Sequence, residues 1–345
     1  MKKPGGAQCA VQNALSYVNL MQRDEKGRSC LMNMTVNNDI PSLEAAASAG
    51  GKPLVMLTDR RRDSALHIAA RHGKLKACRI LLGVGGKDLV MLTKACKSSA
   101  LHLAAFKANA EVTNELLQVG RKDLAMLTTA SGASALYIAA QTGNFEIVWQ
   151  LLTYAGKDIT RLLREACGSS ALHIAAQQGH FYVVDALLEV AGKDLAMLQR
   201  KDGVSALHMA AQNGHVRVSK ALMKIGGGDL IMMQRDDGVS ALYIAAHQGH
   251  LEVVQALLGV GGRELAMLTM YNGESALHIA AQQGHLEVVQ ALLGVGGREL
   301  AMLTDDNNKT ALDIVTWPEH QNGARVDVAR AIMDYADFTD LVGSE

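Results

Sequence analysis

The sequence has few aromatic residues, few prolines and no excess charge of either sign. Phe, Tyr and Trp make up 4% of its 345 residues, and proline occurs 4 times. The core must therefore be built from Ala, Leu, Val, Ile and Met, which leaves room for few large aromatic pockets. Lys plus Arg and Asp plus Glu both number 34. This balance argues against a strongly basic nucleic-acid-binding protein.

Long apolar runs and cysteine motifs are also missing. No apolar stretch approaches the roughly 18 residues that a transmembrane helix needs, and the opening MKKPGGAQCAVQNALSYV lacks the apolar segment of a secretory signal. The five cysteines are scattered and form no C-x-x-C motif, which argues against a disulfide framework or a structural zinc site. We expect an intracellular, cytoplasmic protein with reduced thiols and no membrane span.

One heptapeptide, SALHIAA, recurs along the chain with a period of 35 residues, which is typical of a repeat array. Its copies begin at Ser64, Ser99, Ser134, Ser170, Ser205, Ser240 and Ser275. Degenerate copies begin at Ser29 and Thr310. We expect an N-terminal capping segment with a partial repeat over residues 1–28, tandem repeats over 29–309, and a degenerate last repeat with a C-terminal capping helix over 310–345.

Each repeat contains two short helical patterns. In the repeat that begins at Ser275, the apolar residues at helical spacing are Leu277, Ala280 and Ala281 in the first helix and Val288, Val289, Leu292 and Leu293 in the second. We expect Gly296 and Gly297 to end the second helix. Neither helix can bury its apolar face alone, so neighbouring repeats must stack. The pattern predicts an all-α fold, an α-solenoid.

The residues S-A-L-H-I-A-A, followed by G-H-L-E-V-V and then L-L, resemble the ankyrin repeat over nearly the whole chain. The resemblance implies helix–turn–helix repeats with a finger between them. The sequence departs from the family in two places. Ala stands where the family has Pro at the start of the first helix, which leaves the preceding Ser to cap it. A longer segment, GGRELAMLT, follows the second helix, and its good helix formers predict a short helical turn in place of the first arm of the usual hairpin.

Two repeat positions hold most of the histidines. Five lie in SALH (His67, His102, His173, His208 and His278), four lie in the QGH or NGH turn (His180, His215, His250 and His285), and His72 comes one position earlier. Such a ladder could bind metal or shuttle protons. Tyr137 and Tyr243 replace the first type, which a metal site would not survive, so we interpret these histidines as partners of backbone groups.

No pattern in the sequence supplies a catalytic centre. G-x-S-x-G, P-loop and H-E-x-x-H motifs are absent, and we expect no catalytic residue, no metal and no cofactor. The methionines of the AMLT segment, which include Met126, Met197, Met267 and Met302, could form an adaptable binding groove. We interpret them instead as core between repeats.

Residues that vary between repeats are free to contact a partner. The resemblance implies that the partner surface is concave and is formed by the finger tips before each Ser and by the two residues after the AA of the first helix. Arg and aromatic side chains are enriched in binding hot spots. The candidate partner-binding residues are Arg60, Arg61, Arg62, Arg71, Phe106, Lys107, Lys201, Asp236, Asp237, His247, Tyr271 and Asn272.

The zero net charge conceals a gradient. Residues 1–98 carry 16 basic and 7 acidic side chains, whereas residues 275–345 carry 4 and 11. The electrostatic fields of the two ends are independent of each other, because charges are screened beyond about 8 Å at physiological salt. We expect a non-catalytic scaffold or adaptor that binds a protein or peptide, with an acidic surface favoured at the N-terminal end, no nucleic acid, and weak head-to-tail self-association. An inhibitory or targeting subunit of an enzyme, and an enzyme without a recognisable motif, are the alternatives.

Overall fold

The computed structural model describes residues 19–316 and 323–337, which belong to two compact blocks. We call residues 19–166 the N-terminal block and the described residues from 167 onward the C-terminal block. The chain divides within the one repeat that has an extra residue, between Ser134 and Ser170. Residues 1–18 of the expected N-terminal capping segment lie outside the described residues, as does the insertion at 317–322.

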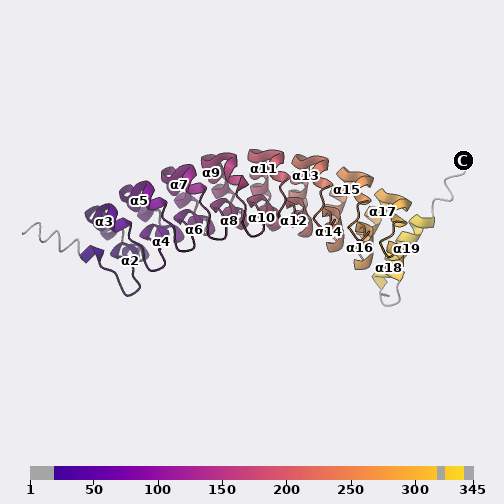
Figure 1. Cartoon of the computed structure of the whole chain (residues 1–345), viewed down its shortest axis with the longest axis horizontal. Helices are drawn as coiled ribbons and strands as arrows, with labels where there is room; N and C mark the ends of the chain where they lie inside the picture. Colours follow the sequence, from indigo (N-terminus) through magenta and orange to yellow (C-terminus); the bar gives the residue numbers. More distant parts are fainter. Residues whose placement is uncertain (1–18, 317–322, 338–345) are drawn as a thin grey trace, which may run out of the picture. The chain divides into compact units, whose positions relative to one another are not determined.

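In both blocks, each repeat contributes a short first helix and a longer second helix. In the N-terminal block the first helices are α2 (Cys30–Asn37), α4 (Ala65–Arg71), α6 (Ala100–Phe106) and α8 (Ala135–Thr142), and the second helices are α3 (Ile40–Val55), α5 (Leu75–Val90), α7 (Ala110–Ala125) and α9 (Phe145–Ala155), which is followed by the 3₁₀ helix η1 (Gly156–Arg161). Within this block the first helices pack side by side in one layer and the second helices in another (Figure 1).

The C-terminal block repeats the same arrangement of two helical layers (Figure 1). Its first helices are α10 (Ala171–Gln178), α12 (Ala206–Gln212), α14 (Ala241–Gln248), α16 (Ala276–Gln283) and α18 (Ala311–Thr316), and its second helices are α11 (Phe181–Ala196), α13 (Val216–Ile231), α15 (Leu251–Ala266), α17 (Leu286–Ala301) and α19 (Gly323–Asp337). The helix α19 packs on α17 and α18 and buries Val328 and Ile332. The fold is an ankyrin-like stack of helix pairs, as the sequence predicts. No helix in the described ranges is both long and apolar enough to cross a membrane.

The core lies between the two layers and is aliphatic. All seven apolar residues predicted for the repeat at Ser275 are 2% exposed or less. The Ser before most first helices caps the helix: the Ser64 hydroxyl, for example, accepts a hydrogen bond from the His67 N–H at 3.4 Å, whereas Ser29 makes no such bond. This cap satisfies one of the free N–H groups of the first turn, where Ala replaces the family's Pro.

The expectation for the methionines is wrong. Met126, Met197 and Met267 are only half-buried, and Met302 is 54% exposed. Each follows the last residue of its second helix and occupies the C-cap position. The Leu two residues earlier, such as Leu300, enters the core instead.

The glycine pair kinks the second helix and does not end it, which corrects the prediction for Gly296 and Gly297. Gly297 has φ 60°, and the helix resumes after it and runs to Ala301. A Cβ on Gly296 would overlap the Leu300 side chain, so the first glycine admits the leucine that follows the kink. The helical turn predicted for this segment is confirmed. In the repeat with the extra residue, the same stretch forms the 3₁₀ helix η1.

A finger follows each kinked helix and leads to the Ser before the next first helix, or to Thr310 in the last repeat. Its ends meet in an isolated antiparallel bridge, as between Thr58 and Ser64, and no longer strand occurs in the described part of the chain. The tip contains one residue with left-handed backbone, usually Gly. Consecutive fingers are linked by backbone hydrogen bonds, such as the one from the Ala130 N–H to the Cys96 carbonyl at 2.9 Å.

A ladder of exposed ion pairs runs beside the kinks. In the N-terminal block Lys52 pairs with Asp88, Lys87 with Asp123 and Lys122 with Asp158; in the C-terminal block Lys193 pairs with Asp229 and Arg263 with Glu299. Each cation pairs with an acid of the next repeat. Exposed pairs of this kind contribute little to stability one by one and are screened by salt.

Arg121 occupies the left-handed position that glycine holds in the other kinks, with φ 49°. A side chain strains this backbone conformation, so Arg121→Gly is expected to raise the free energy of unfolding by about 1 kcal/mol. Urea unfolding followed by circular dichroism measures the change. Arg121→Ala removes the same charge and keeps the strain, and a gain from Ala equal to that from Gly would contradict the backbone explanation.

Candidate partner-binding surface

The histidines of the SALH motif connect each first helix to the finger after it. The Ser205 N–H donates to Nδ1 of His208 at 3.2 Å, and Nε2 of His208 lies 3.1 Å from the Val239 carbonyl oxygen. Because Nδ1 accepts, the proton of the neutral ring is on Nε2, which donates to the carbonyl. His102, His173 and His278 make the same pair of contacts. The interpretation of these histidines as partners of backbone groups is confirmed.

These imidazoles are kept neutral by their surroundings. Burial lowers the pKa of His67, His102, His173 and His208 to about 4, and it also lowers the pKa of His278. Protonation would place a hydrogen on Nδ1, directly facing the Ser N–H that now donates to it. The neutral ring is therefore part of the fold.

The histidines of the QGH or NGH turn link the start of a second helix to the first helix of the preceding repeat. Nε2 of His215 lies 3.0 Å from the Gln177 carbonyl oxygen, and His250 and His285 reach the preceding repeat in the same way. A Cβ on Gly179 would come within 3.0 Å of the His215 ring, so the glycine makes room for the imidazole of the next repeat. In the described residues no three possible metal ligands lie together.

The most basic finger stands between α3 and α4. Its tip residues Arg60, Arg61 and Arg62 are all exposed, and none of them forms an ion pair in the described structure. The Asp59 carboxylate at the base of the finger accepts hydrogen bonds from the N–H groups of Arg61 and Asp63, both at 2.8 Å. The arginines are thus presented on a tip whose backbone is held by its own acid.

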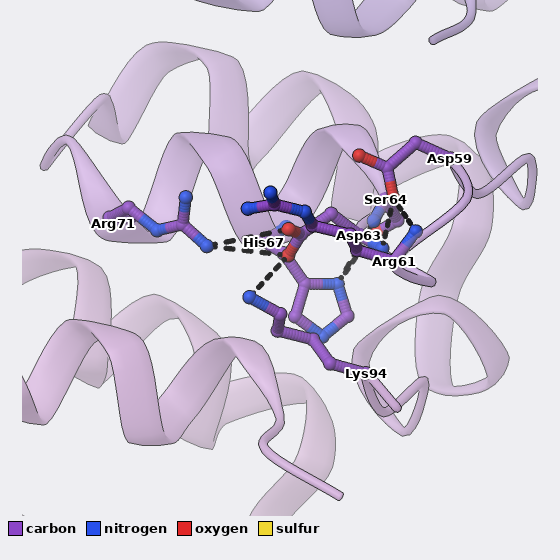
Figure 2. Close-up of polar contacts among 7 residues, drawn as sticks. All are labelled: Asp59, Arg61, Asp63, Ser64, His67, Arg71 and Lys94. Atoms are coloured by element: carbon purple, nitrogen blue, oxygen red, sulfur yellow. Dashed lines mark hydrogen bonds and ion pairs between the residues drawn. The ribbon is translucent and has the colours of Figure 1, made fainter. Parts of the chain in front are cut away.

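Arg71 belongs to the same surface through Asp63. The Asp63 side chain is 7% exposed, and Arg71 and Lys94 approach it at 3.4 Å and 3.1 Å (Figure 2). Arg71 ends α4, whereas Lys94 comes from the next finger. This cluster ties two fingers and a first helix together and neutralises the buried acid.

Phe106 ends α6 and Lys107 follows it, as Arg71 and His72 do at the end of α4, one repeat earlier. Phe106 is 60% exposed, and the Lys107 ammonium lies 5.4 Å from its ring centroid. Since α4 and α6 pack against each other, this aromatic and cationic pair extends the basic surface by one repeat.

In the C-terminal block, three predicted residues are exposed at finger tips. Lys201, Asp236 and Tyr271 each lie over the left-handed glycine of the preceding finger, and the Tyr271 side chain is 76% exposed. They form a mixed surface of one cation, one anion and one aromatic ring.

Three more predicted residues of this block are Asp237, His247 and Asn272. Asp237 pairs with Arg235 at 2.9 Å, and the Asn272 side-chain oxygen accepts a hydrogen bond from the Glu274 N–H at 3.2 Å. His247, on α14, is exposed, and its Nδ1 lies 3.0 Å from the side-chain amide of the next residue. Asp237 and Asn272 therefore also shape their own fingers.

Sequence reasoning missed Lys97 and Lys94. Lys97 is exposed and has left-handed backbone with φ 58°; Lys94 joins Asp63 to the next finger. Aligning the fingers on the period would have shown a lysine where most repeats have Gly. Nothing in the sequence reveals the partner of Lys94, because that contact crosses from one repeat to the next.

The buried histidines predict a pH dependence of stability. Their pKa is lower in the folded state than the value of about 6.5 in the unfolded chain, so the unfolded chain binds more protons between pH 6.5 and 4. Stability is full above about pH 6.5 and falls as the pH drops, at up to about 1.4 kcal/mol per pH unit for each histidine. Urea midpoints at pH 7.5 and 5.0 measure this loss.

A single replacement serves as the control for this prediction. His102→Tyr introduces the residue that stands at the same position in two other repeats. This variant is expected to lose less stability than the unmodified protein between pH 7.5 and pH 5.0. An unchanged loss would show that other groups are responsible.

Comparisons with known families and with solved structures find proteins that have similar repeats. Family profiles described as ankyrin repeats match residues 66–162, 101–198, 150–230 and 172–265 (three copies) and residues 266–315 (many copies). Among solved structures, the human ASB11 ankyrin repeat domain matches with 26% identity and a TM-score of 0.53, over 67% of this chain and 97% of that one. No curated protein sequence matches significantly.

Proposed function

Because the chain belongs to the ankyrin-repeat family, whose repeats are generally protein–protein interaction modules, we propose that it is a non-catalytic intracellular scaffold or adaptor. The fingers of the N-terminal block, together with Arg71, Phe106 and Lys107, bind an acidic segment of a partner protein.

The observation that carries this proposal is the identity of the left-handed residue in each finger. Gly holds this position in six of the nine fingers and Asn308 in the last; the remaining two fingers are consecutive and carry Arg62 and Lys97. A long side chain in this conformation costs about 1 kcal/mol relative to Gly. Strain of this kind concentrates at functional sites, and here both residues are basic and exposed.

The neighbouring residues support the same reading. In the other fingers, a tip residue of the next finger covers the left-handed glycine, and this residue is large in cases such as Tyr271. The corresponding tip residue is Ala95 for Arg62 and Ala130 for Lys97. The small tip leaves the two cations accessible. Nearby acids do not neutralise them, because Asp63 already has Arg71 and Lys94 as partners.

The C-terminal block contributes a second contact region in this proposal. Its exposed Lys201, Asp236 and Tyr271, with Asp237, His247 and Asn272 beside them, are the candidates. The mixed charges and the ring favour a less acidic part of the same partner, where Tyr271 supplies apolar contact.

The finger proposal predicts that stability and binding change in opposite directions. The double variant Arg62→Gly with Lys97→Gly relieves strain at two positions and is expected to unfold at higher urea concentration. It should also bind a fluorescent 15-residue peptide of Glu, Ser and Gly about three- to tenfold more weakly than the unmodified protein, as measured by anisotropy.

Arg121→Gly is the matched control, because it also relieves left-handed strain and removes a cation but lies outside the fingers. It should leave peptide binding unchanged. A peptide with Gln in place of Glu should bind poorly, and equal binding of the two peptides would refute the acidic partner.

The charge gradient also predicts weak association between copies, with the basic N-terminal end of one chain against the acidic C-terminal end of another. Sedimentation velocity at 50 mM and 300 mM NaCl tests this. We expect a concentration-dependent increase in mass at low salt only, since the attraction between surface charges is screened as salt rises. A single species at both salt concentrations would contradict it.

A further inference from the structure

The surface of the second helices in the C-terminal block contains a groove that the finger proposal does not use. It lies between α11 and α13 and has a volume of about 550 Å³, within the roughly 300–1,000 Å³ typical of ligand sites. Its floor is apolar and is formed by Phe181, Leu188, Ala221 and Ile225. Phe181 is one of only 4 phenylalanines in the chain, and it is only half-buried.

Two rows of opposite charge border this floor. Asp185 and Glu189 line it from α11, and Lys220 and Lys224 line it from α13. Within each row the two residues are four apart, so they follow one another along the helix at about 5–6 Å. All four side chains are exposed.

The two rows do not neutralise each other. In the described part of the C-terminal block, none of these four residues forms an ion pair. In the N-terminal block, by contrast, Arg79 of α5 and Glu115 of α7 bridge neighbouring second helices at 2.6 Å. The groove between α11 and α13 is therefore left open, with an acidic edge and a basic edge.

The aromatic end of the groove is preorganised by Arg217. Its guanidinium lies 4.2 Å from the Phe181 ring centroid and 5.8 Å from that of Tyr182, and the two rings meet edge to face with centroids 5.4 Å apart. A second hollow of about 310 Å³ shares Phe181 and Arg217 with the groove and continues it toward the start of both helices.

The combination of an acidic row and a basic row on adjacent second helices occurs on α11 and α13 alone among the described repeats. The helices α15 and α17 carry Gln255 and Gln290 where α11 and α13 carry Asp185 and Lys220. The same two helices carry Gly where α11 and α13 carry Glu189 and Lys224, and they carry Leu where α11 carries Phe181. The chain thus contains its own uncharged version of this surface.

We propose that the groove binds an amphipathic α-helix of a partner protein. The helix lays its apolar stripe on the floor, directs Lys or Arg toward Asp185 and Glu189, and directs Asp or Glu toward Lys220 and Lys224. The spacing of one turn within each row matches the i, i+4 spacing of charges along such a helix. The floor supplies affinity, and the two edges fix the direction of the bound helix.

The test is a display library of 16-residue helices with a fixed apolar stripe and Lys, Glu or Gln varied along its two flanks, selected on the full-length protein. We expect at least tenfold enrichment of helices with Lys on one flank and Glu on the other over helices with Gln on both. The quadruple variant Asp185→Lys, Glu189→Lys, Lys220→Glu and Lys224→Glu should enrich the opposite arrangement. Enrichment without charge preference, or of the same helices by both proteins, would overturn the proposal.

Two double variants distinguish binding in this groove from binding at the fingers and from a loss of folding. Asp185→Gln with Lys220→Gln introduces the residues that α15 and α17 already carry, and a synthetic peptide of the best helix should bind it about tenfold more weakly at an unchanged unfolding midpoint. Arg62→Gly with Lys97→Gly should bind the same peptide as tightly as the unmodified protein does. If the Gln variant retains full affinity, the groove is not the binding site.

Discussion

A neutral imidazole at the start of a first helix joins that helix to the next repeat at four places in the described structure, through His102, His173, His208 and His278. One ring nitrogen accepts from the Ser before the helix, and the other donates to a carbonyl in the next finger, as His208 does between Ser205 and Val239. A single side chain thus caps its own helix and fixes the position of the following repeat. Since the ring is buried, losing either hydrogen bond would leave a polar group unsatisfied, at a penalty of about 1–3 kcal/mol.

The fingers share one backbone conformation, and this uniformity gives meaning to their exceptions. Where the backbone of every finger must turn through a left-handed residue, Gly is the least strained choice, and Arg62 and Lys97 depart from it. In the second helices the exception is a change of charge and ring chemistry on α11 and α13, against the uncharged pattern of α15 and α17. The finger region thus departs from the glycine that most fingers carry, and the groove departs from the uncharged residues of α15 and α17.

The repeat period and the two helices of each repeat could be predicted from the sequence, because SALHIAA recurs and the apolar residues follow helical spacing. The end of the second helix could not. A glycine pair is typical of a helix end, but packing of Leu300 against Gly296 draws the chain back into helix after the kink at Gly297. The kink also resets the helical register, which is why Leu300 is buried while Met302 is exposed. The candidate binding residues Arg60 and Tyr271 are exposed, as the sequence predicts. The contact of Lys94 with Asp63 could not be predicted, because it spans two repeats and has no local signal in the sequence.

The ion-pair ladder explains how an array of this kind can change its length. Each complete kink segment carries both halves of the pair, an acid for the cation of the preceding repeat and a cation for the acid of the following one, as Lys87 and Asp88 show. Inserting a copy of such a repeat therefore adds one new pair and leaves no charge without a partner. Gly228 interrupts this pattern, because it stands where Lys193 and Arg263 supply cations in the adjacent repeats. A repeat inserted directly after this one would therefore bring an acid that meets no cation of the preceding repeat.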